Sequence, residues 1–395
     1  MGRNKKRMTH ILVECPELIA SVKVGVLIPL EPQAGITYDI KFRCTRDIRW
    51  KDICWADVFI CVRGCEEATK YLVSQAKKEH RFIIYYLDDD LLHLPKESGS
   101  YAYYADKTQA EALRTILQYS DVLWGVNPRI KDKYLSLCGG HRWIWNRVPM
   151  KIKETPQKNT GSVRILYAGS KDHEHMIRQI LVPAVRKVCE DEGDRVHFTF
   201  LGVDSGIRDL PQVSNHNYFE NYDDYRRFVE NGNFAVGLAA IRTEEFYQCK
   251  YYNKFVEYSS IGAAGVFTDC ELYRQVVVDG ENGLLCSNDP GAWVVAIEQM
   301  VENAELRNAC INNAQRFLRT EFACEDVCRC IMRQLPELIE YRAPKVTRVN
   351  LLCDMPKVMF YWSRMKFLFR QHGLLAIPVI CQKAIKKAVR KLRGN

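Results

Sequence analysis

The feature that most constrains the fold is a repeated alternation of short apolar runs with longer amphipathic stretches. Residues 57–62, 81–87 and 121–125 are apolar runs of strand length, and helix-like stretches lie between them. The alternation resumes at residues 163–169, a run that ends at a glycine. Alternation of this kind is typical of parallel βαβ units. The sequence therefore predicts an α/β protein built from doubly wound sheets.

A polar segment divides the chain into two such series. Residues 151–161 (KIKETPQKNTG) contain a proline and show no hydrophobic periodicity, which is typical of a linker between domains. The length of 395 residues is sufficient for two or three domains with real cores. We therefore expect one Rossmann-like domain over 1–150, a second over 162–340 and a separate segment over 341–395.

The densest pattern lies within residues 249–286, which read as helix, strand, helix and strand. On the first helix, expected over 251–261, Lys250, Lys254 and Glu257 are spaced by four and three residues and share one face. Two ammonium groups near a helix N-terminus can hold a diphosphate, and a carboxylate one turn further can accept hydrogen bonds from ribose hydroxyls. The pattern predicts that these three residues carry the chemistry of a nucleotide-sugar site. The alternative is an exposed Lys–Glu face that pairs with itself.

The same stretch resembles the donor-site signature of retaining glycosyltransferases of the GT-B fold, the family 4-like group known as glycosyl transferases group 1. The resemblance rests on KFVEY at 254–258, Gly262, VFTD at 266–269 and DGENGLL at 279–285. It implies that the two Rossmann-like domains face each other across the linker. The first domain would bind the acceptor and the second the donor, with Glu257 gripping the ribose.

One position departs from this signature. The family usually has a glutamate eight residues before Glu257 that touches the donor sugar, and here that position is Cys249. Some bacterial branches place a lysine nearby, as Lys250 would be. Cys249 also favours an alternative reading, in which the chain is a non-catalytic protein that binds a sugar nucleotide or a glycan and keeps the fold.

Further donor contacts are expected where the first strand of the second domain ends. Ligands of open α/β sheets bind at the carboxyl ends of strands, and a glycine there lets backbone approach a phosphate. Gly169, Ser170 and Lys171 occupy that place, and the resemblance implies a basic residue near the diphosphate. The alternative is an ordinary β–α turn with a solvated lysine. We also assign Asn253, beside Lys254, to the donor site.

In the first domain, polar residues follow two neighbouring strands. Asp88, Asp89 and Asp90 end one strand and Arg63 ends another, so we predict that all four line the acceptor side of the cleft. Helix capping and metal binding are the alternatives for the aspartates. Three successive side chains point in different directions, so we predict no metal site and no cofactor beyond the nucleotide-sugar substrate.

Positive charge is concentrated at the C-terminus. The chain carries a net charge of +9, but residues 341–395 hold thirteen basic residues and one acid, which leaves the rest of the chain slightly negative. Residues 355–393 interleave aromatic and aliphatic side chains with these basic residues and end in a basic amphipathic helix. Such segments bind anionic bilayer surfaces. Packing against the first domain and binding of nucleic acid are the alternatives; we expect no nucleic acid.

The cysteines and the N-terminus indicate a cellular location. Sixteen cysteines in a long chain whose start lacks an apolar signal segment indicate reduced thiols. No run reaches 18 apolar residues, so no membrane span is expected. With the resemblance, this predicts a cytoplasmic protein, peripheral to the inner face of the membrane. It would be a retaining, metal-independent glycosyltransferase that moves a hexose-type sugar from a nucleotide diphosphate to a glycan or lipid-linked acceptor in bacterial surface polysaccharide or glycolipid synthesis.

Overall fold

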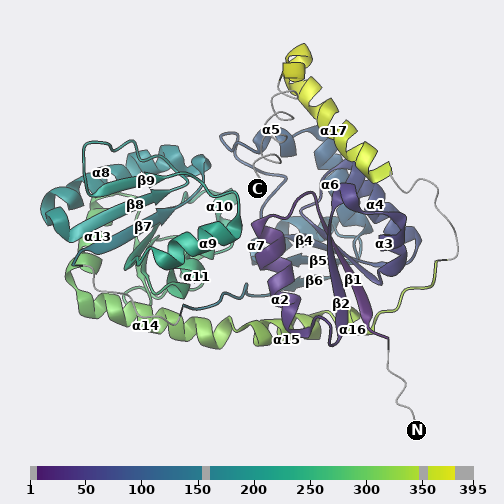
Figure 1. Cartoon of the computed structure of the whole chain (residues 1–395), viewed down its shortest axis with the longest axis horizontal. Coiled ribbons are helices and arrows are strands. Elements are labelled where there is room, and N and C mark those ends of the chain that lie inside the picture. The colour runs from purple at the N-terminus through teal and green to yellow at the C-terminus, as the bar shows by residue number, and fades with distance from the viewer. Residues whose placement is uncertain (1–6, 154–160, 347–354, 379–395) are drawn as a thin grey trace, which may run out of the picture.

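The computed structural model describes residues 7–153, 161–346 and 355–378, and its strands form two separate six-stranded sheets (Figure 1). The first sheet has the order β2-β1-β3-β4-β5-β6 and the second the order β12-β11-β10-β7-β8-β9. Every neighbouring pair of strands in both sheets is parallel. The predicted α/β class with two doubly wound, Rossmann-like domains is therefore confirmed.

The strands of the first sheet are β1 (Thr9–Cys15), β2 (Tyr38–Cys44), β3 (Val58–Val62), β4 (Phe82–Leu87), β5 (Val122–Gly125) and β6 (Trp143–Trp145). Those of the second are β7 (Val163–Ala168), β8 (Val196–Leu201), β9 (Val213–His216), β10 (Val236–Ala239), β11 (Ala264–Thr268) and β12 (Leu284–Cys286).

The helices of the first half are α1 (Ala20–Val22), α2 (Ile28–Leu30), α3 (Trp50–Trp55), α4 (Glu67–Lys78), α5 (Tyr101–Tyr104), α6 (Lys107–Tyr119) and α7 (Pro128–Tyr134). Those of the second half are α8 (Glu174–Glu192), α9 (Tyr222–Asn231), α10 (Glu245–Gln248), α11 (Asn253–Ser260), α12 (Glu271–Arg274), α13 (Pro290–Glu302) and α14 (Ala304–Glu321). Three more follow: α15 (Cys324–Gln334), α16 (Glu337–Glu340) and α17 (Met355–His372).

Successive side chains of a strand point to opposite faces of a sheet, and in these parallel sheets both faces pack against apolar clusters. In β7, Ile165 packs in the same apolar cluster as α8 and α13, whereas Leu166 packs in the cluster that contains α11. In β3, Phe59 packs in the cluster that contains residues of α4 and α6, and Ile60 in the cluster that contains residues of α2 and α15. The near-continuous apolar runs read from the sequence are the direct result of this two-sided burial.

The chain returns to the first sheet after the second is complete. Figure 1 shows α14 and α15, in green, following one another along the lower side from the second sheet to the first. Val327, Cys328 and Ile331 of α15 are buried, and α15 packs on α2. The sequence assigned residues through 340 to the second domain, but residues 324–340 lie against the first, because the apolar face of α15 is buried there.

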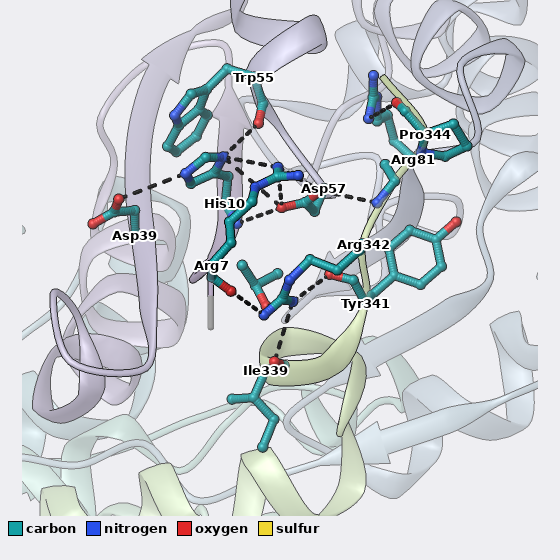
Figure 2. A network of polar contacts seen from close by, with 12 residues as sticks. Arg7, His10, Asp39, Trp55, Asp57, Arg81, Ile339, Tyr341, Arg342 and Pro344 are labelled. Atoms are coloured by element: carbon teal, nitrogen blue, oxygen red, sulfur yellow. Dashed lines mark hydrogen bonds and ion pairs between the residues drawn. The ribbon is translucent and has the colours of Figure 1, made fainter. Parts of the chain in front are cut away.

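A polar network around Asp57 ties this returning segment to β1 (Figure 2). The Asp57 carboxylate is fully buried and accepts two hydrogen bonds from the Arg7 guanidinium, at 3.0 and 2.9 Å. It also accepts from the backbone amides of His10 and Ala343, both at 2.9 Å. Arg342 donates to the carbonyls of Arg7, Ile339 and Tyr341. One buried carboxylate therefore joins segments that are 286 residues apart.

The first part of the predicted tail packs on the first domain. Helix α17 contacts α4, and the Arg364 guanidinium donates to the buried Glu66 carboxylate at 3.1 Å. The Phe367 ring lies edge-on to Tyr103, with ring centroids 5.2 Å apart. The packing alternative thus holds for one side of α17, and the basic helix expected at 379–393 lies outside the described residues.

Two further expectations concern the whole chain. Within the three described ranges, no helix is long and apolar enough to cross a bilayer. No cysteine in the described part of the chain forms a disulfide.

Candidate functional site

A cleft of about 750 Å³ opens where the C-terminal ends of strands from the second sheet approach the first domain. It is lined by the ends of β7, β8 and β10, by the start of α11 and by residues 17–20, which follow β1 of the first sheet. The carboxyl ends of parallel strands are where open α/β sheets bind ligands. The cleft is therefore the candidate site.

Helix α11 presents an ion pair to this cleft. The Glu257 carboxylate accepts hydrogen bonds from Lys254 Nζ at 2.5 Å and from the Tyr225 hydroxyl at 2.8 Å. Burial works against the charged form of Lys254, but Glu257 and Tyr258 raise the net pKa of this lysine. The two residues pair with each other, as the alternative reading supposed, yet both line the cleft together with Asn253. An oriented carboxylate and a charged ammonium group are thus held at its wall.

Lys250 also lines the cleft, but it is not part of the helix. Helix α10 ends at Gln248 and α11 begins at Asn253, so the expectation of one helical face for Lys250, Lys254 and Glu257 is wrong for the first of these. The reason lies in the other domain. The Asn127 side chain donates to the carbonyls of Gln248 and Lys250, at 2.8 and 2.7 Å. These carbonyls therefore have hydrogen-bond partners in the first domain and do not need partners within a helix.

The ammonium group of Lys250 reaches across to the first domain. Its Nζ lies 3.2 and 3.4 Å from the two oxygens of Asp89. Arg63, whose backbone has a φ of 53°, lies 3.4 Å from Asp88 and 3.6 Å from Asp89. Asp88 lines a smaller cavity of about 100 Å³ that it shares with Asn253 and Glu257. None of Arg63, Asp88 and Asp89 is among the residues that line the larger cleft. They lie beside it, close to the residues predicted to bind the donor.

Asp90 differs from its two neighbours in being fully buried, away from the cleft. It accepts hydrogen bonds from Lys133 at 2.7 Å, Tyr134 at 2.6 Å and His93 at 2.8 Å. Burial alone would raise the pKa of Asp90, but these hydrogen bonds bring it below its ordinary value. Asp90 therefore anchors α7 instead of facing a ligand. No group of three metal-binding side chains occurs among the described residues.

The turn after β7 contributes unevenly to the cleft. Gly169 and Ser170 line it, whereas Lys171 is exposed and lies outside the lining. Sequence reasoning missed several lining residues, among them His173 of the same turn and Tyr225 of α9. The signal for His173 was its position four residues after Gly169. Tyr225 had no signal, since only the tertiary fold places α9 beside Glu257.

A search with family models gives one match that bears on this site. Residues 254–317 match the model of glycosyl transferases group 1, so the matched segment begins at Lys254 and includes Glu257. A search of the curated proteins gives no match. The resemblance drawn from residues 254–285 is thus confirmed for this segment.

Solved structures similar to the whole chain extend the comparison to both domains. HepE from Anabaena in complex with UDP and glucose superposes with a TM-score of 0.60 at 11% identity, over 84% of this chain and 100% of its own. A glycosyltransferase from Rickettsia africae gives a TM-score of 0.59 at 11% identity, over 85% and 100%. The fold is GT-B. Sucrose-phosphate synthase from Thermosynechococcus elongatus has a similar structure, with a TM-score of 0.58 at 12% identity, over 84% and 99%.

Within this GT-B fold, Cys249 does not occupy the cleft. Its side chain is fully buried in an apolar cluster of the first domain, and burial raises the pKa of its thiol to about 11. The nearby Glu245 carboxylate is paired with Lys133 at 2.8 Å. Lys250 is thus the charged residue closest in sequence to Cys249 that lines the cleft.

Proposed function

We propose that the chain is a glycosyltransferase that binds a nucleotide-diphosphate sugar in the cleft and transfers the sugar to a glycan or lipid-linked acceptor. The observation that carries this proposal is the Lys254–Glu257 pair at the cleft wall, inside the segment that matches glycosyl transferases group 1. Two structures of the same fold support the donor class. HepE has been solved with UDP-glucose, and the pneumococcal O-GlcNAc transferase GtfA with UDP and GlcNAc, at TM-scores of 0.58 and 0.53.

In this proposal the donor is held by charge. The ammonium groups of Lys250 and Lys254 line the cleft and would balance the two negative charges of the diphosphate, and the Glu257 carboxylate would accept hydrogen bonds from the ribose hydroxyls. Lys250 would exchange Asp89 for a phosphate oxygen, which frees Asp89 at the acceptor side. Because the lysines stabilise the departing diphosphate, we propose that transfer requires no metal ion.

The chemical step then needs no protein base. The bond between the anomeric carbon and the β-phosphate oxygen breaks, and the acceptor hydroxyl oxygen attacks from the same face. Its proton passes to the departing diphosphate, and configuration is retained. Catalysis is positioning together with charge stabilisation of the leaving group.

A second candidate is a non-catalytic protein that binds the same nucleotide sugar. It is favoured by the burial of Cys249, since no carboxylate takes the place of the glutamate that the family usually has there. Hydrolysis of a bound donor without acceptor distinguishes the two candidates, because a binding protein shows none.

The first test is a thermal-shift screen against nucleoside diphosphates and nucleotide sugars. A ligand at 100 times its Kd that binds only the folded state stabilises it by about 2.7 kcal/mol, which raises the Tm by several degrees. We expect one base to give such a rise, and chelation with EDTA to leave both the rise and donor turnover unchanged. A flat screen together with absent turnover would refute the proposal, and a loss of turnover in EDTA would refute metal independence.

We further propose that the enzyme works at the inner face of the membrane in the synthesis of a surface polysaccharide or glycolipid. The side of α17 that faces away from the first domain exposes Tyr361 (47%) and Trp362 (52%), with Lys366 beside Trp362. Aromatic and basic residues together suit an anionic bilayer surface. Arg364 of the same helix lies 3.6 Å from Glu17, a cleft residue, so membrane contact through α17 would bring the cleft near lipid-linked acceptors.

Deletion of residues 379–395 is expected to release the protein from vesicles of anionic lipid. It removes six basic residues, each worth about 1 kcal/mol near such a surface, and leaves α17 packed on the first domain. Flotation with phosphatidylglycerol vesicles measures the release. A control variant changes Arg178, Lys187 and Arg195 of the second domain to glutamine and keeps vesicle binding. Undiminished binding by the deletion variant rules out residues 379–395 as the anchor.

A further inference from the structure

The donor cleft contains a histidine to which the proposed function gives no role. His173 ends the short helix η5 (Lys171–His173), between β7 and α8, and lines the cleft with Lys250 and Lys254. Its Nδ1 is buried and has no hydrogen-bond partner among the described residues. A buried polar atom without a partner costs free energy, and such atoms in native structures call for an explanation. Because protein atoms cover Nδ1, an oxygen of a ligand in the cleft would satisfy it once the imidazole turns toward the cleft that His173 lines.

The charged groups around the imidazole come from several elements. Lys250 precedes α11, Lys254 lies on α11 and Arg242 follows β10, so three cations act on His173. Among the acids, its neighbour Asp172 has the largest effect on the imidazole. The Asp172 carboxylate accepts hydrogen bonds from the Gly99 amide and the Ser98 hydroxyl of the first domain. The Tyr247 ring of α10 lies 6.0 Å from the imidazole, between centroids.

These surroundings keep the imidazole neutral. Burial and the cations, Lys250 foremost, lower the pKa of His173 to about 4, and Asp172 opposes them only in part. A bound diphosphate raises the pKa of His173 in two ways. Its two negative charges offset the lysines, and its oxygens offer the partner that Nδ1 lacks.

We propose that His173 takes up one proton from solvent when the nucleotide-diphosphate sugar binds, and that its Nδ1–H then donates a hydrogen bond to a diphosphate oxygen. This inference rests on the proposed function and names a third cationic residue for the donor. The bound complex carries imidazolium where the free protein carries imidazole. His173 is thus a residue that binds the leaving group and is charged only when the leaving group is present.

The proposal makes donor affinity depend on pH with a definite sign. The pKa of His173 is higher in the complex than in the free protein, so lowering the pH between these two values favours the complex. Donor binding therefore tightens as the pH falls from 8 to 6. Lysines and arginines stay charged throughout this range and give no such slope.

The test is isothermal titration calorimetry of the full chain with UDP-glucose, in buffers of different ionisation enthalpy. If the screen selects another base, the corresponding nucleotide sugar is used instead. The diphosphate of a nucleotide sugar has no free terminal phosphate to titrate near neutral pH, so proton uptake reports on the protein. At pH 6.5 we expect about 0.5 to 1 proton taken up per bound ligand.

Matched variants assign the proton to one residue. His173→Asn and His173→Gln should abolish the uptake and weaken binding by about three- to tenfold at pH 6.5, with a smaller loss at pH 8. His175→Asn, an exposed histidine two residues further on, should behave as wild type. Equal Tm values without ligand exclude a folding defect.

The outcomes separate the two proposals. Tight binding without proton uptake, or uptake that persists in both His173 variants, overturns the role of His173 and leaves the donor site intact. Absence of binding by every nucleotide sugar overturns the proposed function and this inference together.

Discussion

Glu257→Gln is expected to weaken donor binding by about 10- to 100-fold, because a hydrogen bond to a charged group contributes about 1.5–3 kcal/mol. The carboxylate lies at the cleft wall between Lys254 and the Tyr225 hydroxyl. Glutamine keeps its shape and its bond to Tyr225 but loses the charge that orients Lys254 and that would accept the ribose hydroxyls. Titration of the nucleoside diphosphate found in the screen measures the loss.

The matched control for this variant is Glu230→Gln on the neighbouring helix α9. Glu230 pairs with Arg226 at 2.7 Å and does not line the cleft. We expect this control to keep wild-type affinity. Unchanged affinity in Glu257→Gln would remove Glu257 from the site, and an equal loss in both variants would indicate a general effect of charge.

Asp57→Ala is expected to destabilise the protein by about 2–4 kcal/mol, because a backbone amide left without its acceptor in the interior costs about 1–3 kcal/mol. The Arg7 side chain is 48% exposed, so solvent can take over part of its hydrogen bonding. The variant leaves the Arg7 guanidinium and the amides of His10 and Ala343 without their acceptor. Because this carboxylate joins β1 to the segment that returns from the second domain, the loss should appear in urea unfolding of the first domain. Trp124, fully buried between the layers of that domain, is one of the tryptophans whose fluorescence reports it.

Asp39→Ala is the control from the same network (Figure 2). The side chain of Asp39 is 44% exposed, and its contact with His10 is 3.8 Å long. An exposed pair of this kind contributes about 0–1 kcal/mol, so little stability should be lost. A loss in Asp57→Ala no larger than in this control would show that the Asp57 carboxylate is not what holds the returning segment.

Local patterns in the sequence predicted much of the fold. The apolar runs at Val58–Val62 and Phe82–Leu87 are strands because an all-apolar run of five or six residues is stable only when both faces are buried. The Lys254–Glu257 pair was also predictable from a local pattern. Three residues along a helix place two side chains on one face wherever that helix lies, so their pairing was predictable from the sequence.

Contacts between distant segments decided the rest. Lys250 leaves the helix because Asn127 of the first domain takes up the carbonyls beside it. Successive aspartates separate into Asp89, which meets Lys250 of the second domain, and Asp90, which is buried against α7. No spacing along the chain encodes these outcomes, since each depends on which group of the other segment is brought near.

The sequence by itself determined the two sheets, the parallel order that their helices require and the charged face of α11. The tertiary structure alone decided the path of α15 and α16 back to the first sheet, the burial of Cys249 and the neutral state of His173. Periodicity along the chain specifies which side chains share a face. The pKa of a group and the partners of a buried charge depend on desolvation and on fields from residues far away in sequence, and these exist only once the chain is folded.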